Sequence, residues 1–586
     1  MHDRQELNRR GFTTRLGLTG CLLGLSPHAS SYARHSPEKS ADITNGAQGS
    51  KAAVATVHPS ATDAAIACLK RGGNAVDAAV AASLMLSVVD SHNSGIGGGG
   101  LALIRLANGS MVAIDGREMA PKNCSAEQYK GNDGKPDPKL SQDGPLAVAT
   151  PGLIALLEKI STSFGKVSWK ESLLGAAEVA DQGFRVSAYF ASVLKDNAAK
   201  LRKFPSSASV LFDPSGQPWS EGSTLRQPDL ARSLRSMAEQ GSKWFYEGEF
   251  AERMEKFMLQ EGGYLRASDF ADYKALSRSV IQCKYRGQTV NGFSPPSSGG
   301  IHIAQMLTML EQFDVAEIFK TRPEQAYHLL LEVMKRALAD RAHWLGDADF
   351  AKVPKALLDP QYLKYRASTI DLNRATKVES HGVPPRADID LFGAGGHTTH
   401  LTVADADGNV VALTQTVNTS FGSKMILPGT GIVLNNEMDD FSLAPGVRNA
   451  FGLLGSDANG IVPRKRPLSS MSPSIVTDGS GNPTFTCGAA GGPRIITVAL
   501  QSLVRAIDLK QNPAEILAAP RVHHQWSPNQ SVIDNSMPAE IVSKLTEMGH
   551  EIQKVRHVAT AQAIQVLPGA ITAASDPNVP SSARAI

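Results

Sequence analysis

Residues 399–416 have the pattern of a β-hairpin, and this feature constrains the fold of the chain more than any other. Two segments rich in β-branched residues flank Asp407 and Gly408, a residue pair that strongly indicates a tight turn between strands. Because alternate residues of a strand share a face, a turn near Asp407 places Thr416 opposite Thr398, within a residue or two. Threonine also favours strands without any chemistry, so the periodicity alone leaves a purely structural interpretation open.

Composition describes a soluble globular protein and excludes several classes. Of 586 residues, 42% are apolar and 20% are charged, which supplies ample material for a large core. The formal net charge of +3 is small for this length, so we expect no nucleic-acid partner. The five cysteines are scattered without a Cys-x-x-Cys pair, which argues against a disulfide scaffold or a zinc site. We therefore expect buried cysteines, no metal and no cofactor.

The first 33 residues have the pattern of an export signal. Four arginines up to position 15 precede an apolar run at residues 16–25, which is too short to span a bilayer. Residues 8–12 resemble a twin-arginine signal, whereas residues 18–21 are similar to a lipoprotein cleavage box and leave a lipid anchor at Cys21 as a second interpretation. We expect a periplasmic or secreted protein, in which residues 34–51 form a disordered linker.

A run of glycines at residues 95–100 follows a segment predicted to be a buried helix. The helix is expected to begin at Asn74 with Asp77 and to continue through an apolar stretch up to residue 89. A phosphate-binding loop would continue with Gly-Lys-Ser or Gly-Lys-Thr, but an apolar, strand-like segment comes next. The glycines therefore indicate close backbone packing at a sheet edge.

Four further blocks, taken together with residues 398–400, resemble the γ-glutamyltransferase family. They are Asp-Gly-Arg-Glu-Met-Ala-Pro at 115–121, Asn-Asn-Glu-Met-Asp-Asp-Phe-Ser at 435–442, Arg-Pro-Leu-Ser-Ser-Met-Ser-Pro at 466–473 and the glycine pair at 491–492. The resemblance extends from about residue 52 to the end of the chain. It implies an α/β fold, the four-layered αββα sandwich of the N-terminal-nucleophile (Ntn) hydrolases.

The resemblance also implies that the precursor cleaves itself between His397 and Thr398. The large chain, residues 52–397, and the small catalytic chain, residues 398–586, would then stay together as a heterodimer. Prolines and glycines in residues 374–397 interrupt regular structure, as an accessible junction requires. A free N-terminal threonine carries its own general base, because an α-amino group has an unperturbed pKa of about 7.7–8.0.

Each remaining site residue receives a role from the same resemblance. Thr416 would hydrogen-bond the Thr398 hydroxyl, and Gly491 and Gly492 would present backbone N–H groups to the oxyanion. Arg117, which by itself could be an ordinary ion pair beside two acids, would bind the substrate α-carboxylate through its planar fork. The other expected substrate contacts are Glu437 and Asp440 to the α-amine, Asn418 as a neutral acceptor, and Ser469 and Ser470 to the carboxylate.

The implied activity is that of a γ-glutamyltransferase and glutathione hydrolase. The γ-glutamyl group of glutathione, or of another γ-glutamyl compound, would pass to Thr398 and then to water or to an amino acid or dipeptide acceptor. Two alternatives share the pattern: a cephalosporin (glutaryl) acylase on the same scaffold, and an inactive protein that binds γ-glutamyl compounds. Both acids at Glu437 and Asp440 argue against the acylase, and an intact Thr398 argues against the inactive protein.

Residues 445–456 match a segment that covers the substrate pocket in the resembled family. Some members have a tyrosine there that closes this lid through a hydrogen bond, whereas this chain has Phe451, which can only pack. The balance between hydrolysis and transfer to an amine therefore stays open at this point.

Overall fold

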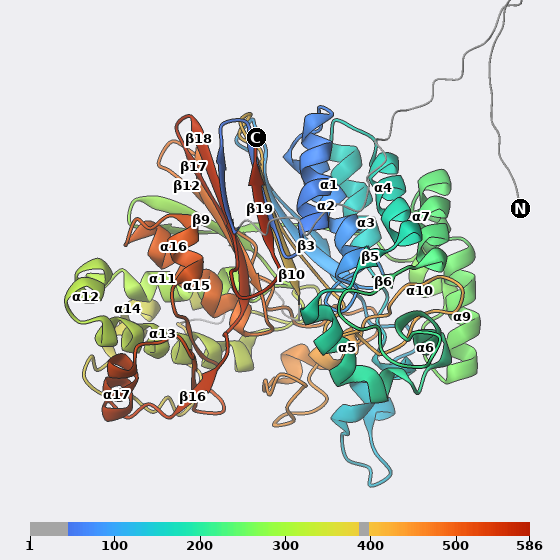
Figure 1. Ribbon diagram of the computed structural model, residues 1–586. Coiled ribbons are helices and arrows are strands. Elements are labelled where there is room, and N and C mark those ends of the chain that lie inside the picture. The colour runs from blue at the N-terminus through green and yellow to red at the C-terminus, as the bar shows by residue number, and fades with distance from the viewer. Residues whose placement is uncertain (1–44, 386–397) are drawn as a thin grey trace, which may run out of the picture. The chain divides into compact units, whose positions relative to one another are not determined.

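The computed structural model describes residues 45–385 and 398–586. Within them, two seven-stranded sheets lie face to face, and helices cover the outer side of each sheet (Figure 1). This arrangement is the four-layered αββα sandwich predicted from the sequence. The predicted export signal, Cys21 and His397 lie outside the described residues.

The first sheet contains the predicted hairpin near its centre. All neighbouring strands in it are antiparallel. Their order is β19 (Ser582–Ala585), β2 (Ala52–Thr56), β10 (Thr399–Asp405), β11 (Val410–Thr416), β3 (Gly99–Arg105), β4 (Met111–Gly116) and β7 (Leu276–Arg278).

The second sheet is also antiparallel throughout, and its first edge strand corrects a prediction. Gly46 to Gly49 pair with β18, so the disordered linker expected over residues 34–51 is wrong at this position. Small residues carry little strand propensity of their own, and the strand forms because its backbone groups pair with the neighbouring edge. The order is β1 (Gly46–Gly49), β18 (Ala570–Ser575), β17 (Thr560–Leu567), β13 (Pro483–Ala490), β12 (Ser474–Thr477), β9 (Gln288–Phe293) and β8 (Val280–Tyr285).

Helices α1 to α3 cover the first sheet, α4 packs on α2 and α7, and α5 to α10 complete this side of the molecule (Figure 1). Helix α2 confirms the prediction for its segment: a capping box between Asn74 and Asp77 begins it, and every residue in it is buried. The bounds are α1 (Pro59–Lys70), α2 (Ala75–Val89), α3 (Leu153–Phe164), α4 (Trp169–Gln182), α5 (Ala188–Leu201), α6 (Pro205–Leu211), α7 (Pro228–Gln240), α8 (Lys243–Tyr246), α9 (Glu249–Glu261) and α10 (Ala267–Ala271); β5 (Phe184–Arg185) and β6 (Thr224–Leu225) form a small ribbon.

The second sheet is covered by α11, α15 and α16, and the remaining helices pack outside them (Figure 1). None of the helices in residues 45–385 and 398–586 is long and apolar enough to cross a membrane. The bounds are α11 (Gly299–Leu310), α12 (Val315–Thr321), α13 (Pro323–Trp344), α14 (Pro360–Ser368), α15 (Arg494–Ile507), α16 (Pro513–Ala518) and α17 (Ala539–Glu547), with a three-stranded sheet of β14 (Val522–His524), β15 (Ser531–Asp534) and β16 (Ile552–Val555).

Apolar side chains fill the space between the two sheets. Leu101 and Leu103 of β3 meet Ile475 of β12 and Ile564 of β17 there, all fully or almost fully removed from solvent. Burial of this kind is the main force that holds two sheets together, at roughly 25 cal/mol for each Å² of apolar surface removed from water. Four described cysteines are buried and unpaired, as predicted: Cys68, Cys124, Cys283 and Cys487.

Candidate active site

Thr398 directly precedes the first residue of β10 and lies across from the last residue of β11. The register pairs Thr399 with Gln415, and continuing it by one residue brings Thr398 opposite Thr416. The turn residue Gly408 has φ +89°, which a glycine adopts without strain. The predicted hairpin is therefore confirmed, and the sequence placed the two hydroxyl-bearing residues correctly. Both side chains are buried, and Thr416 Oγ1 accepts a hydrogen bond from the Asn418 N–H at 2.8 Å.

The glycine run packs backbone against backbone beside this pair, as predicted. Gly99 pairs with Thr416 across the sheet. A Cβ on Gly98 would lie 1.8 Å from the Thr416 carbonyl oxygen, and one on Gly97 would lie 2.1 Å from the Val433 carbonyl oxygen. Only glycine fits at such distances, so a larger residue here would push β11 out of position.

The glycine pair predicted for the oxyanion lies where β13 leaves the second sheet. His400 of β10 packs against β13, where a Cβ on Gly488 would lie 2.4 Å from the imidazole ring. Residues two apart in a strand share a face, so Thr398 lies on the same side of β10 as His400. It therefore points toward the end of β13, after which Gly491 follows. Gly491 and Gly492 have φ values of +138° and +62°, so both adopt backbone conformations that favour glycine.

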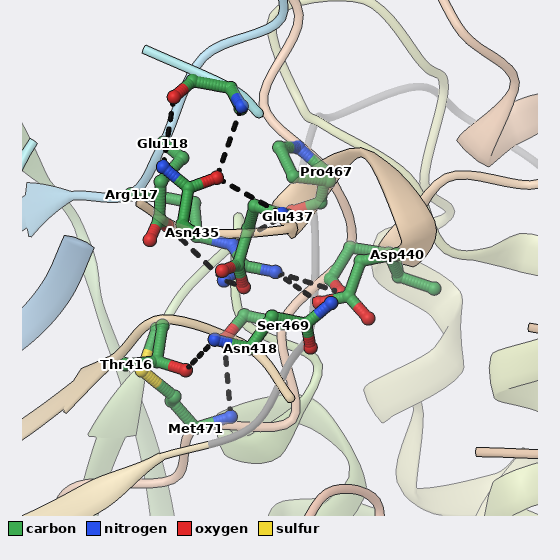
Figure 2. A network of polar contacts seen from close by, with 12 residues as sticks. Arg117, Glu118, Thr416, Asn418, Asn435, Glu437, Asp440, Pro467, Ser469 and Met471 are labelled. Atoms are coloured by element: carbon green, nitrogen blue, oxygen red, sulfur yellow. Dashed lines mark hydrogen bonds and ion pairs between the residues drawn. The ribbon is translucent and has the colours of Figure 1, made fainter. Parts of the chain in front are cut away.

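Arg117 is fully buried and contacts both acids that were predicted to hold the substrate amine (Figure 2). Its Nη1 donates to Glu437 Oε1 and, at 3.3 Å, to Glu118 Oε2, and its Nη2 donates to Asp440 Oδ2 at 2.5 Å. Its Nε donates to the Pro467 carbonyl oxygen at 3.2 Å. The structure thus brings residues 117, 437 and 440 together from segments more than 300 positions apart.

The cluster holds three carboxyl groups around one guanidinium. Burial raises the pKa of Glu437, although Arg117 opposes this effect, and the nearby Glu118 raises it further. Burial also raises the pKa of Glu118 and of Asp440. For Arg117, burial acts to lower the pKa, but the attraction of Glu437, Glu118 and Asp440 exceeds it, so the pKa rises above its ordinary value. Burial thus disfavours the charged forms of the three carboxyl groups around Arg117.

Two asparagines connect this cluster to the end of β11 (Figure 2). Asn418 Nδ2 donates to the Asn436 carbonyl oxygen at 2.9 Å, one residue before Glu437. Asn435 Oδ1 accepts from the Glu437 N–H at 3.0 Å, while its Nδ2 donates to the Gly97 carbonyl oxygen at 2.8 Å. The glycine run therefore fixes the position of the acid segment as well as that of β11.

Ser469 and Ser470 lie beside the cluster, close to a second buried arginine. Ser469 Oγ accepts from the Met471 N–H at 3.2 Å (Figure 2). Ser470 Oγ accepts from Arg341 Nη2 at 3.4 Å, and burial lowers the pKa of Arg341 to about 10. Neither hydroxyl contacts Arg117 directly, but the backbone carbonyl of Leu468 accepts from its Nη2 at 3.4 Å. The two serines are thus neighbours of the Arg117 cluster.

The predicted lid, residues 445–456, covers Asp440. Several of its residues, together with Arg341 and Asp440, line a cavity of about 20 Å³. The Ala450 N–H donates to Asp439 Oδ2 at 2.9 Å, and the Phe451 carbonyl accepts from Gln525 Nε2 at 3.2 Å. The cavity has room for a water molecule but not for an amino acid.

A much larger cavity of about 330 Å³ lies beside the nucleophile. Thr398, Asn418 and Gly491 are in its wall, which brings the predicted nucleophile and one predicted oxyanion donor to a common space. None of residues 117, 437, 440, 469 and 470 lines it. The cavity therefore borders the nucleophile but not the buried acid cluster.

Asp90, which directly follows α2, is a buried acid in the wall of the same cavity. Its carboxylate accepts hydrogen bonds from Thr399 Oγ1 at 2.5 Å and from Asn93 Nδ2 at 3.0 Å. Burial raises its pKa to about 7, and the hydrogen bonds from Thr399, Asn93 and Ser94 only partly oppose this effect. Asp90 therefore holds the residue next to the nucleophile in place.

We expect Asp90→Asn to remove a pH-dependent loss of stability. The folded pKa of Asp90 lies above the unfolded value of 3.8, so the wild type loses free energy of unfolding as pH rises from about 4 to about 7. The full loss is on the order of 4 kcal/mol at about 1.4 kcal/mol per pKa unit. Asparagine keeps one acceptor for Thr399 and does not titrate, so the variant's melting temperature should rise relative to wild type between pH 4.5 and pH 8. A constant difference across that range would contradict the expectation.

Sequence reasoning missed three residues of the site. Asp90 directly follows α2, and Arg341 lies in the last turn of α13. The patterns of both helices indicate only a structural role, and the partners of both residues are remote in the sequence. Asn435 belongs to the recognised block at 435–442, yet its bonds to residues 97 and 149 depend on the fold. No local pattern identifies such residues.

Known proteins resemble the chain over almost its whole length. Residues 61–586 match the family described as gamma-glutamyltranspeptidase. The glutathione hydrolase proenzyme of Escherichia coli (strain K12) is 40% identical over 538 residues, which cover 92% of this chain and 92% of that protein.

Solved structures confirm the N-terminal-nucleophile hydrolase fold. A cephalosporin acylase from Bacillus halodurans has a TM-score of 0.81 and 26% identity, covering 94% of this chain and 99% of that one. The gamma-glutamyltranspeptidase of Helicobacter pylori has a TM-score of 0.53 and 34% identity, covering 61% of this chain and 97% of that one. With the family match, these likenesses establish that the chain belongs to the γ-glutamyltranspeptidase family.

Proposed function

We propose that this protein is a self-cleaving γ-glutamyltransferase and glutathione hydrolase. Cleavage before Thr398 gives a small chain of residues 398–586 that stays bound to the large chain ending at residue 397. Strand β10 supports such an association, because it pairs with β2 of the large chain as well as with β11 of its own chain. Both chains therefore contribute strands to each sheet and cannot separate without unfolding.

The observation that carries this proposal is the buried cluster of Arg117 with three carboxyl groups. A γ-glutamyl group ends in an α-ammonium and an α-carboxylate. The ammonium fits the acceptor oxygens of Glu437 and Asp440, and the carboxylate fits the Arg117 fork, so ion pairs are exchanged without any change in net charge.

The chemistry follows from the position of Thr398. Its Oγ adds to the γ-carbonyl carbon, the amide C–N bond breaks, and the hydroxyl proton passes through the α-amine to the leaving nitrogen. Backbone N–H groups at Gly491 and Gly492 stabilise the oxyanion. Water or an amine then adds to the ester, the C–Oγ bond breaks, and the incoming nucleophile's proton returns to Thr398. Thr416 supports the nucleophile from the opposite strand.

The acylase alternative has a specific structural argument in its favour, the likeness to the Bacillus halodurans acylase. It differs from our proposal in the charge of the substrate. A glutaryl group has a carboxylate but no ammonium, so it would add a negative charge to a cluster that already has surplus acids. Charge balance therefore favours the γ-glutamyl group.

Two donors that differ only in the α-amine test the proposal. We expect the mature protein to cleave γ-glutamyl-p-nitroanilide with a kcat/KM at least about a hundredfold above that for glutaryl-p-nitroanilide, since a site built around a polar group rejects the analogue that lacks it. Release of p-nitroaniline is followed by absorbance at several donor concentrations. A preference for the glutaryl compound would instead support the acylase, and cleavage of neither would support an inactive binding protein.

A further inference from the structure

We propose that a separate cavity of about 180 Å³ binds a small tetrahedral oxyanion, such as phosphate or sulfate, between the segments before and after the proposed cleavage site. Lys335 and residues 375–377 line it from the first segment, and His524 and residues 529, 531 and 549–551 line it from the second. None of these residues lines the Thr398 cavity. The inference therefore goes beyond the proposed function and does not depend on it.

The buried charges behind this cavity do not balance. Lys335 and Arg336 of α13 are both 2% exposed, and both form ion pairs with the fully buried Glu332, at 2.8 Å and 2.7 Å. The other acceptors of Arg336 in the described part of the chain are neutral carbonyl and hydroxyl oxygens. Burial acts to raise the pKa of Glu332, but Lys335, Thr376 and Arg336 together lower it to about 2. One carboxylate thus serves two buried cations, and an anion would balance the second.

Lys335 presents this surplus charge to the cavity. Of the three hydrogens of its ammonium, one goes to Glu332 Oε1 and one, at 3.2 Å, to the Thr376 carbonyl oxygen. The described residues provide no acceptor for the third, and Lys335 lines the cavity. Two exposed side chains in the wall, Lys377 and Glu551, carry opposite charges and are screened by water. Lys335 therefore sets the sign of the site.

His524 of β14 supplies a second donor to the same cavity. Its Nδ1 accepts from the Trp526 N–H at 2.9 Å, so the hydrogen of the neutral ring is on Nε2. Burial, and after it the charge of Lys335, lowers the pKa of His524 well below its ordinary value, so the ring is neutral at neutral pH. The side chain is 1% exposed, and Nε2 makes no hydrogen bond to any residue in 45–385 or 398–586. A buried donor of this kind gains free energy when an acceptor reaches it.

Two further histidines beside the cavity are held in a chain of hydrogen bonds. The Asp371 carbonyl oxygen accepts from His328 Nε2 at 2.7 Å, so His328 Nδ1 is the acceptor for His550 Nε2, also at 2.7 Å. His550 Nδ1 then accepts from the Ser531 hydroxyl at 3.1 Å. Every ring nitrogen in the chain therefore has a partner, and neither histidine offers a spare lone pair.

This chain decides between an anion and a metal ion. His328, Glu332 and His550 have ligand atoms within 4.8 Å of one another, as a metal site requires. However, their lone pairs are engaged, and Glu332 already meets Lys335 and Arg336. A divalent cation would add two charges to a cluster with a positive surplus, so charge favours the oxyanion. A volume of about 180 Å³ is below the usual range for organic ligands and suits one small ion.

The test measures binding of inorganic phosphate to the mature protein by titration calorimetry at constant ionic strength. We expect Lys335→Met to weaken phosphate binding about tenfold or more, because a hydrogen bond to a charged group is lost. This variant leaves Glu332 paired with Arg336, so its buried charges balance and the fold should persist. His524→Phe removes the second donor and should weaken binding less. Lys320→Met is the matched control, because it removes the same charge from an exposed side chain of α12 and should leave binding unchanged.

Other ions provide the second arm of the test. Phosphate and sulfate have four oxygens that can meet Lys335 and His524 together, so both should bind more tightly than acetate, and chloride should not compete. Equal effects of chloride or acetate, or equal phosphate affinity in wild type, Lys335→Met and His524→Phe, would overturn the inference. Binding of Zn²⁺ without binding of phosphate would overturn it in favour of a metal site. If Lys335→Met did not fold, His524→Phe would still decide. Anilide cleavage by wild type is a separate readout, so failure here leaves the proposed function standing.

Discussion

Thr398→Ala is expected to remain a single chain and to lose γ-glutamyl transfer by at least about ten-thousandfold, the range seen when a catalytic nucleophile is removed. Alanine has no hydroxyl to attack either the preceding peptide bond or a donor. The side chain is small and buried, and the change removes a hydroxyl and a methyl group at the end of β10, so we expect the fold to persist. A denaturing gel and an anilide assay read out the two effects.

Thr398→Ser is the matched control for this change. Serine keeps the hydroxyl and loses only the methyl group, so the variant should still cleave itself and retain measurable activity, both more slowly than wild type. If Thr398→Ala retained more than a few per cent of the wild-type rate, the nucleophile would have to lie elsewhere. If Thr398→Ser were as inactive as Thr398→Ala, the hydroxyl would not explain the loss.

Arg117→Lys should lower kcat/KM for γ-glutamyl-p-nitroanilide by about 10- to 150-fold, which corresponds to about 1.5–3 kcal/mol for hydrogen bonds to charged groups. Lysine keeps the positive charge but offers one nitrogen, whereas Arg117 reaches Glu437, Asp440 and the Pro467 carbonyl with three. Self-cleavage should be intact, because Arg117 does not line the Thr398 cavity.

Arg117→Lys should also lower the melting temperature, since buried carboxylates that lose a partner destabilise a fold. Arg235→Lys is the matched control: it alters an exposed pair with Asp181 and should change neither stability nor kcat/KM. An Arg117→Lys enzyme with wild-type kcat/KM would rule out the assignment of Arg117 to the substrate carboxylate, whatever its stability.

The sequence was most informative where a local pattern fixes a local structure. The residue pair at 407–408 and the alternation around it placed Thr398 opposite Thr416, and the structure has that register. The capping box at Asn74 and the apolar stretch after it predicted α2 in the same way. In these segments each residue's own preference agrees with the fold.

Recognised blocks supplied the site residues, but only the fold explains why they belong together. Nothing near residue 117 in the sequence indicates that its guanidinium meets Glu437 and Asp440. Asp90 was missed for the same reason: it follows a buried helix, and the cavity that it lines with Thr398 exists only after the sheets have packed. Strand β1 was missed because its small residues become a strand only through pairing with β18.

The most direct test of the central claim is the chain composition of active, purified protein. We predict two co-purifying chains, the smaller one about 20 kDa by proportion of the 62.2 kDa total, with an N-terminal sequence that begins Thr-Thr-His at residue 398. Denaturing electrophoresis, intact mass and N-terminal sequencing of the same sample measure this. Fully active protein that remains one uncleaved chain would contradict the account, since Thr398 would then have no free amine to act as its base.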